Sequence, residues 1–183
     1  MVTHRILAAI ALVALAGAPI AAPAQTKPAP KAAPKPAAAP AGKFDARDPA
    51  SLVALLQSTD AKAEVARKTD QEVFLNVTTA GLAFGVQFAG CDAGGKTCKA
   101  MAFNTASEKR GATLGQVNSF NQTSLTCRAY QDKAGKMNVM YATLIGSADT
   151  RDELRTHVSA WQGCLASFGE FLQNPTGYLA AAP

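Results

Sequence analysis

The chain has 183 residues, of which 48% are apolar, 17% charged and 7% aromatic, a composition that excludes a collagen, a coiled coil and a fully disordered chain. The formal net charge is +5, but the excess lies before Phe44, and from Phe44 onward 13 basic residues balance the 13 acidic ones. The part of the chain that can fold is therefore neutral, and we expect no nucleic-acid partner.

Residues 1–24 have the pattern of a secretory signal peptide. A short basic segment that ends at Arg5 precedes an apolar run over residues 6–16, and an Ala-Pro-Ala sequence that ends at residue 24 places small side chains at both positions that signal peptidase recognises. We predict cleavage before Gln25, a periplasmic or secreted protein, and no integral membrane segment after cleavage. The alternative is an uncleaved membrane anchor, but Pro19 and Pro23 interrupt the apolar stretch.

Residues 25–43 contain five prolines, seven alanines and four lysines and show no apolar periodicity. Such a segment cannot bury enough apolar surface to fold, and its prolines favour an extended polyproline II conformation. We predict a disordered linker that acts as a spacer. Two alternatives remain: its lysines contact anionic surfaces of the cell envelope, or the segment is the active tether of a structural envelope protein.

Residues 44–173 are enough for one folded domain, and we expect residues 174–183 to form a flexible C-terminal tail. Asp48 and Pro49 are typical of the N-cap and first residue of a helix, and leucines at helical spacing extend this helix to about residue 59. Residues 64–68 form a short, polar strand candidate.

Alternating apolar residues over 72–78 and 82–88, with a turn at Ala80-Gly81, predict a half-buried β-hairpin. The same reasoning predicts, in chain order, a strand over 99–104, a short helix over 114–121 and two strands over 125–131 and 137–144.

The last helix begins at Asp149 or Thr150 and carries the strongest periodic signal in the chain: Leu154, Val158, Trp161, Leu165, Phe168 and Leu172. Without the polar candidate over 64–68, the element order is α-β-β-β-α-β-β-α. This order predicts the α+β class, with an antiparallel sheet packed with helices.

The four cysteines of an exported protein are expected to form disulfides. Cys91 and Cys98 bracket a loop between two predicted strands, and the strand ends of a hairpin lie within reach of a disulfide. Cys127 shares a predicted core face with Leu125, and Cys164 lies at the edge of the apolar stripe of the last helix. A 127–164 disulfide would attach that helix to the sheet, whereas the two other pairings would cross from the hairpin to the helix and are disfavoured.

Other chemistry at the cysteines is less well supported by their spacing. Six residues separate Cys91 from Cys98, unlike the two residues between the cysteines of many thiol-redox pairs. A zinc site, or a nucleophile paired with a base, would depend on His157, the only histidine after residue 24. We predict that His157 is a solvated surface residue and that the protein has no catalytic residue, metal or cofactor.

Residues 90–97, from Gly90 to Thr97, match the Walker A pattern G-x-x-x-x-G-K-[ST] letter for letter. That motif binds phosphates because a helix follows it and presents its N-terminus to them. Here the next residues alternate as in a strand, and we interpret the segment as a hairpin loop. A nucleotide-binding protein that uses this loop, or a thiol-redox protein that uses Cys91 and Cys98, is the alternative.

The combined pattern resembles the YbjN-type domain family over roughly residues 49–172. The features that carry the resemblance are Phe88-x-x-Cys91, Cys98, the helix Leu114-x-x-Val117-Asn118-x-x-Asn121, the strand Arg128-Ala-Tyr130 and the terminal helix with Trp161 and Phe168. The resemblance implies a type III secretion chaperone-like fold, which belongs to small, often paired modules that bind polypeptides. It also implies a sensory transduction regulator without established catalytic residues. The leader and the linker depart from the family pattern and argue against a cytoplasmic role.

Four polar residues are candidates for partner binding. Asn118 and Asn121 share one helical face and could present their amides to a partner or anchor the helix to neighbouring turns. Arg128 and Tyr130 alternate with core residues and so face away from the core, as partner-binding residues or as ordinary cross-strand pairs. We expect a non-enzymatic, chaperone-like or regulatory interaction module whose partner is a protein of the cell envelope or a second copy of the chain.

Overall fold

The computed structural model describes residues 43–108 and 111–182. The predicted signal peptide and the predicted linker, apart from its last residue, lie outside these described residues. No helix among the described residues is long and apolar enough to span a membrane.

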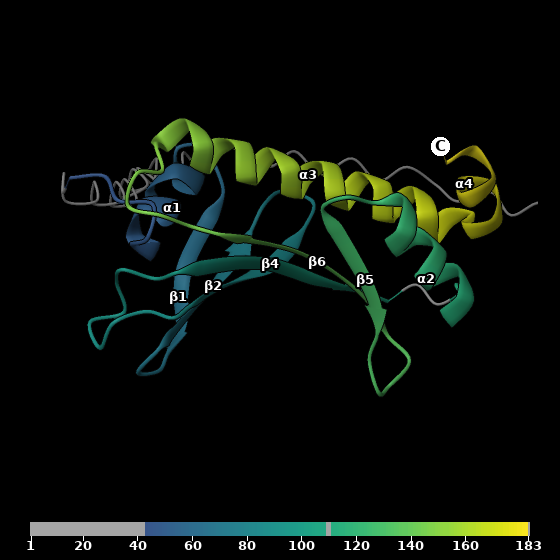
Figure 1. The fold of residues 1–183 in the computed structure, drawn as a ribbon, viewed down its shortest axis with the longest axis horizontal. Helices are drawn as coiled ribbons and strands as arrows, with labels where there is room; N and C mark the ends of the chain where they lie inside the picture. The colour runs from purple at the N-terminus through teal and green to yellow at the C-terminus, as the bar shows by residue number, and fades with distance from the viewer. Residues whose placement is uncertain (1–42, 109–110, 183) are drawn as a thin grey trace, which may run out of the picture. The chain divides into compact units, whose positions relative to one another are not determined.

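The centre of the domain is one antiparallel sheet of six strands in the order β1-β2-β3-β4-β6-β5 (Figure 1). Its strands are β1 (Lys62–Lys68), β2 (Glu72–Thr78), β3 (Ala83–Ala89), β4 (Ala100–Ser107), β5 (Cys127–Gln131) and β6 (Met137–Leu144). Strands β1 and β5 form the two edges, and β4 lies beside β6 although α2 and β5 come between them in the sequence.

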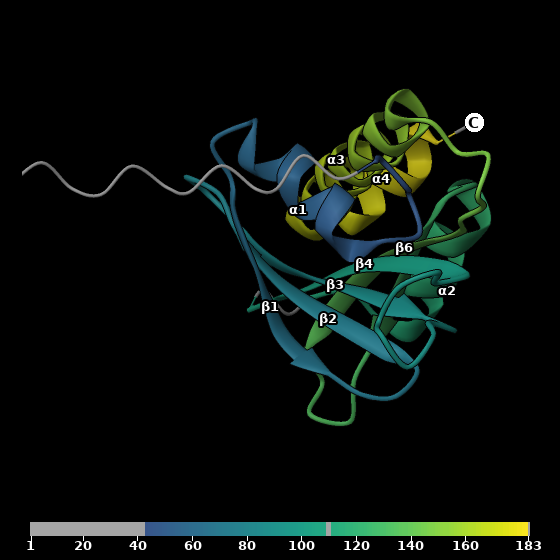
Figure 2. The ribbon, with the colours of Figure 1, turned by 90° about the vertical axis from the view of Figure 1, so that its left-hand side faces the viewer.

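Four helices surround this sheet: α1 (Pro49–Gln57), α2 (Leu114–Thr123), α3 (Arg151–Gln173) and α4 (Pro175–Ala181). Helices α1, α3 and α4 lie on one side of the sheet, and α2 lies beside the edge strand β5 (Figures 1 and 2). Asp48 caps α1 and Pro49 is its first residue, as predicted. Of the two predicted caps of α3, Thr150 is the N-cap, and its hydroxyl accepts from the Glu153 amide.

The core lies between α3 and the sheet. The alternating strand residues that face α3 are almost fully buried, and Trp161 of α3 stacks on Phe103 of β4 with ring centroids 5.8 Å apart. The largest fully buried side chains are Trp161, Phe88, Phe103, Phe120, Phe171, Leu52, Leu75, Met101, Met137 and Leu154. The α+β class and the antiparallel sheet are therefore confirmed.

The structure differs from the sequence predictions in three elements. The polar candidate over 64–68 is a full strand, β1, because it pairs with β2 at the sheet edge and needs only one buried side chain, Ala63. The expected flexible tail contains α4, which Asn174 caps and which packs Tyr178 against Phe120 and Phe171. Leu125 precedes β5 and is 94% exposed, so its predicted place on the core face is wrong.

Candidate functional site

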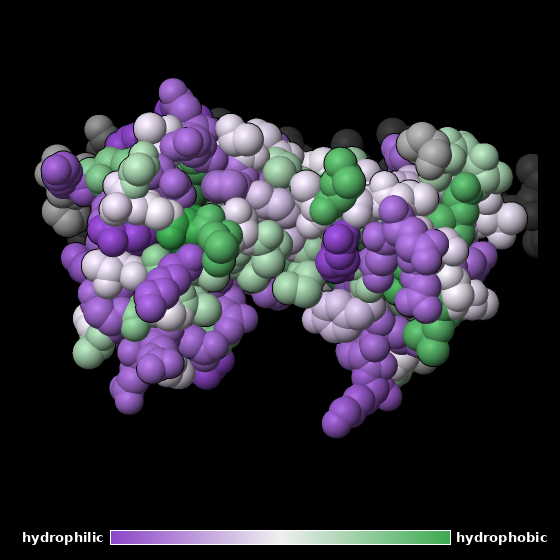
Figure 3. Space-filling view, viewed as in Figure 1, coloured by the Kyte–Doolittle hydropathy of each residue, from purple (hydrophilic) through white to green (hydrophobic). Residues whose placement is uncertain are grey.

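One face of the sheet carries no helix among the described residues, and we call it the open face. It consists of the strand residues that alternate with the buried ones: Phe74, Asn76, Gly85, Gln87, Ala102, Asn104, Arg128, Tyr130, Asn138, Met140, Ala142 and Leu144. In the space-filling view the lower margin of the domain is indented between its two ends (Figure 3). The open face is therefore an extended, hollowed surface.

A depression of about 430 Å³ lies on the open face where β2, β3 and β4 meet. Gly85 makes room for it, because a Cβ at this position would lie 3.0 Å from the Asn104 side-chain oxygen. At the other end of these strands the Gln87 amide donates to Glu72 at 2.7 Å, and the Arg67 guanidinium lies 3.8 Å from the centroid of the Phe74 ring. The face is thus polar at β1–β3 and lined by small side chains in its middle.

Arg128 and Tyr130 lie on the open face, as predicted from their alternation with buried residues. Tyr130 is 45% exposed. One terminal nitrogen of Arg128 donates to the carbonyl oxygens of Ser124 and Cys127, at 2.8 and 2.6 Å. No carboxylate among the described residues pairs with this guanidinium, so it remains available to an acidic group from outside.

The two asparagines of α2 have different environments. The Asn121 amide donates to the Ala129 carbonyl at 3.0 Å and accepts from the Ala129 amide at 2.7 Å. It thereby occupies the outer edge of β5 as a neighbouring strand would, and the Ser124 hydroxyl accepts from the next free amide, that of Cys127. The Asn118 side chain is exposed and forms no hydrogen bond with a described residue. Asn121 therefore anchors the helix to the sheet and is not available to a partner.

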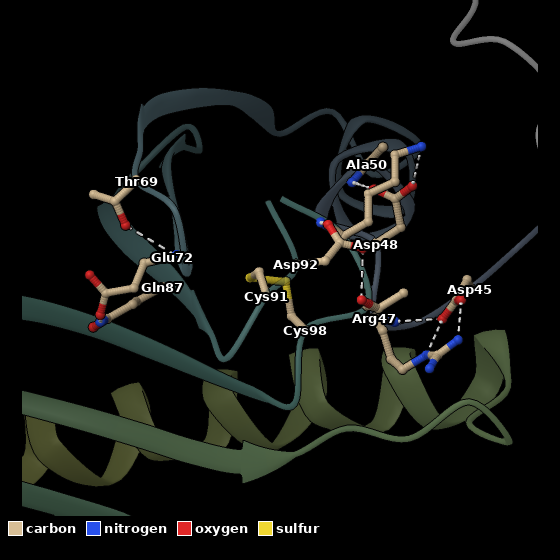
Figure 4. Close-up of a disulfide and its surroundings, with 12 residues drawn as sticks. Asp45, Arg47, Asp48, Ala50, Thr69, Glu72, Gln87, Cys91, Asp92 and Cys98 are labelled. Carbon is tan, nitrogen blue, oxygen red and sulfur yellow. Dashed lines mark hydrogen bonds and ion pairs between the residues drawn. A yellow bond between two sulfur atoms is a disulfide. The ribbon is translucent and has the colours of Figure 1, made fainter. Parts of the chain in front are cut away.

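Two disulfides are present, Cys91–Cys98 and Cys127–Cys164, which is the pairing predicted from the sequence. The first closes the loop between β3 and β4 beside the start of α1 (Figure 4). The second joins β5 to the middle of α3.

The loop that matches the Walker A pattern lacks the geometry of a phosphate site. Asp92 accepts hydrogen bonds from the Lys96 amide and the Thr97 hydroxyl, and these bonds, the amide's first, hold the pKa of its carboxyl below its usual value. The Lys96 ammonium pairs with Asp48 at 3.2 Å. The segment continues into β4 and not into a helix, so the loop's donors bind Asp92. The helix start beside the loop is that of α1, which the Asp48 side chain already caps.

His157 is half-buried and not solvated as predicted. Its Nδ1 lies 2.7 Å from the hydroxyl of Tyr141, a residue whose side chain lies on the core face of β6. Sequence periodicity could not reveal this pair because its members belong to different elements. Among the described residues, no group of three or more His, Cys, Asp or Glu side chains could hold a metal ion.

Comparison with known proteins gives one match. The model of the YbjN family, described as "Putative bacterial sensory transduction regulator", matches residues 48–174. No similar curated protein and no similar solved structure was found. The match spans α1 to the end of α3, and so contains the whole sheet and the open face.

Proposed function

Because the chain belongs to the YbjN family, we propose that it is an exported, non-enzymatic regulatory module that binds another protein through the open face of its sheet. The family description supports a regulatory role. A regulator of this kind acts through a binding surface and needs no reaction centre. The partner we propose is a protein of the cell envelope.

The observation that carries the proposal is the one-sided construction of the domain. The helices that cover the sheet lie on a single side of it, and the opposite side presents backbone, small side chains and single apolar groups such as Met140 and Leu144. A surface of this kind, with an unpaired arginine at its margin, suits an extended polypeptide better than a small substrate.

Export is supported by two independent features. The leader has a basic start, an apolar run and small residues before position 25. All four cysteines are paired, which fits an oxidising compartment such as the periplasm. The N-terminus of the protein recovered from its native cells tests this part, and we expect it to be Gln25.

Site-specific photocrosslinking in the native cells tests the binding surface. A photoreactive residue replaces Gln87 or Tyr130 on the open face, and Ser159 on the exposed side of α3 provides the matched control. We expect the two open-face positions to crosslink to the same envelope protein and the control position to give no adduct.

The crosslinking result also separates the other interpretations. An adduct between two copies of the chain at the open-face positions would identify a homodimer in place of a separate partner. The proposal would be overturned if the purified protein is strictly monomeric and neither open-face position gives an adduct above the Ser159 control.

A further inference from the structure

The last part of β6 has a neighbouring strand on one side only. Strand β6 pairs with β4 along its whole length to Leu144, whereas β5 pairs only with residues 137–141 of β6. Residues 142–144 of β6 therefore form an internal edge of the sheet, beside the point where β5 begins. We call this edge and the surface around it the β6 notch.

The direction of the free backbone groups follows from the alternation of an antiparallel ladder. The Ile145 amide donates to the Lys99 carbonyl on the β4 side at 3.0 Å. Thr143, two residues earlier, faces β4 in the same way, so the N–H and C=O groups of Ala142 and Leu144 point away from β4. The Leu144 carbonyl accepts from the Thr143 hydroxyl at 3.2 Å, which leaves two amides and one carbonyl without a strand partner.

The two outer edges of the sheet are protected, and the β6 notch is not. Asn121 and Ser124 occupy the edge of β5. Strand β1 carries four charged side chains and an irregular register between Val65 and Arg67. Charges, bulges and covering side chains are the usual means by which edge strands avoid pairing with other chains. The residues of the notch have none of these.

Exposed apolar side chains flank the notch. Leu144 is 80% exposed and Leu125 is 94% exposed. In Figure 3 strongly hydrophobic surface lies over the end of β6 and again over the start of β5, with a paler surface between them. A hollow of about 380 Å³ joins this region and is lined by Leu125, Thr126, Arg128, Met140, Tyr141, Ala142 and Thr143.

One charge lines this hollow, the guanidinium of Arg128, and no described carboxylate neutralises it. A partner that fits the notch therefore needs free backbone groups in an extended conformation, apolar side chains for the two leucines and a carboxylate for the arginine. The unpaired stretch is only three residues long. A short segment of chain fits this length better than the long edge of a second folded sheet.

We propose that the β6 notch binds a short, extended, acidic-apolar segment of a partner polypeptide as an added strand. The segment pairs with the backbone of Ala142 and Leu144, places apolar side chains on Leu125 and Leu144, and places a carboxylate on Arg128. This inference rests on the proposed function, because it identifies how the partner is held at the margin of the open face.

A library of random seven-residue peptides, selected against the full chain recovered from its native cells, provides the probe. We expect the selected peptides to alternate apolar residues and to contain Asp or Glu. A fluorescent copy of the best peptide then gives a Kd by anisotropy. We expect Leu125→Ser, Leu144→Ser and Arg128→Gln each to weaken binding about tenfold, the loss expected for one apolar contact or one charged hydrogen bond.

Leu114→Ser is the matched control, because Leu114 is 63% exposed at the start of α2 and lies outside the notch. The replaced leucines are exposed, so all three leucine variants should fold normally. A second control is the same peptide with methyl groups on alternate backbone nitrogens, which should not bind because it cannot pair as a strand.

Amide hydrogen exchange gives a direct readout. The Ala142 and Leu144 amides should exchange quickly in the free protein and slowly with peptide bound, whereas the Thr143 amide should be slow in both states. Equal affinity of the notch variants and Leu114→Ser, or equal binding of the methylated peptide, would overturn the inference. Loss of self-association in Leu125→Ser would also overturn the inference, because the notch would then bind a second copy of the chain.

The two proposals fail in different ways. In one outcome, Leu125→Ser and Arg128→Gln change neither the peptide affinity nor the crosslinks at Gln87 and Tyr130. The notch inference would then be wrong, and the proposed function would still hold. Peptide binding at the notch in a protein that gives no crosslink in cells would instead contradict the proposed function.

Discussion

Asn118 and Asn121 lie three residues apart on α2, yet only the Asn121 side chain has a structural role. Asn121 completes the edge of β5 with one donor and one acceptor, so its amide replaces a neighbouring peptide group. The Asn118 side chain faces solvent and has no hydrogen-bond partner among the described residues. The pair therefore offers an experiment in which the same chemical change is made at an occupied and at a free amide.

We expect Asn121→Ala to lower the free energy of unfolding by about 1–3 kcal/mol, because it leaves the amide and carbonyl of Ala129 without partners in a half-buried position. Asn118→Ala, the matched control, should change it by less than about 0.5 kcal/mol. Urea denaturation followed by circular dichroism measures both values. Equal effects of the two substitutions would show that the Asn121 bonds do not stabilise the domain.

Glu153 has a defined electrostatic role at the start of α3. Its carboxylate accepts from the Thr150 amide at 2.6 Å, and this bond, followed by interaction with the Thr150 side chain, lowers the pKa of Glu153 below its usual value of 4.5. A lowered pKa in the folded state means that the charged form stabilises the fold above pH 4.5. This contribution is lost as the pH falls through the lowered value.

We therefore expect Glu153→Gln to be less stable than the wild type at pH 7, with a difference that shrinks as the pH falls below 4.5. Glutamine still accepts the capping bond but lacks the charge, so the variant isolates the electrostatic part. Thermal unfolding at a series of pH values measures the difference between the two proteins. A difference that stays constant over this range would contradict the assignment.

At the scale of elements, the disulfides constrain chain segments of very different length. Cys127 and Cys164 are 37 residues apart, whereas Cys91 and Cys98 are separated by 7. The entropy that a crosslink removes from the unfolded chain increases with the length of the loop that it closes. The bond between β5 and α3 should therefore contribute more to stability than the bond within the β3–β4 loop.

Removal of each pair by a double Cys→Ala substitution tests this ranking. Loop entropy alone gives a loss of about 4 kcal/mol for the 127–164 bond and about 2.5 kcal/mol for the 91–98 bond. Each double variant serves as the control for the other, because both remove two sulfurs from buried positions. Urea titrations give the two losses, and a larger loss for the 91–98 pair would contradict the entropic ranking.

Helix α4 shows how an element can be hidden from sequence analysis. The segment over 175–181 is short and carries small residues, so its pattern resembles that of a tail. Its helical state depends on Asn174, whose side chain accepts from the Gly177 amide, and on Tyr178, whose ring lies 5.8 Å from both Phe120 and Phe171. The aromatic contacts come from two other helices, and no local signal predicts them.

For the molecule as a whole, contacts within the described domain hold its N-terminal end in place. The Arg47 carbonyl accepts from the Cys98 amide at 3.1 Å, Asp48 pairs with Lys96, and the Arg151 guanidinium lies 5.4 Å from the Phe44 ring centroid. These contacts connect the start of the domain to the 91–98 loop and to α3.

We expect a chain that begins at Lys43 to unfold at the same urea concentration as one that begins at Gln25. A chain that begins at Ala50 is the matched control, and it should lose about 1–3 kcal/mol because the contacts of Phe44–Asp48 and the cap of α1 are gone. A lower midpoint for the chain that begins at Lys43 would mean that residues 25–42 contribute to the stability of the domain.

Periodicity predicted most of the sheet because its signal is local. The alternation of Val73, Leu75 and Val77 places one face of β2 in the core whatever its neighbours are. The position of β4 beside β6, and the start of β5 only after Leu125, depend on pairings between distant segments. The β6 notch arises from that difference in strand length, so the sequence could name Arg128 as a candidate but could not place it beside a free edge.

The contacts at the start of the domain also have a mechanical consequence. A pulling force on the chain upstream of Lys43 would enter the fold at Arg47 and pass through its bond to Cys98 into the loop between β3 and β4. The 91–98 disulfide closes that loop covalently, so the load is transferred to two strands in the middle of the sheet. A load on the upstream chain is thus directed toward the centre of the sheet, away from the edge strand β5 and the β6 notch beside it.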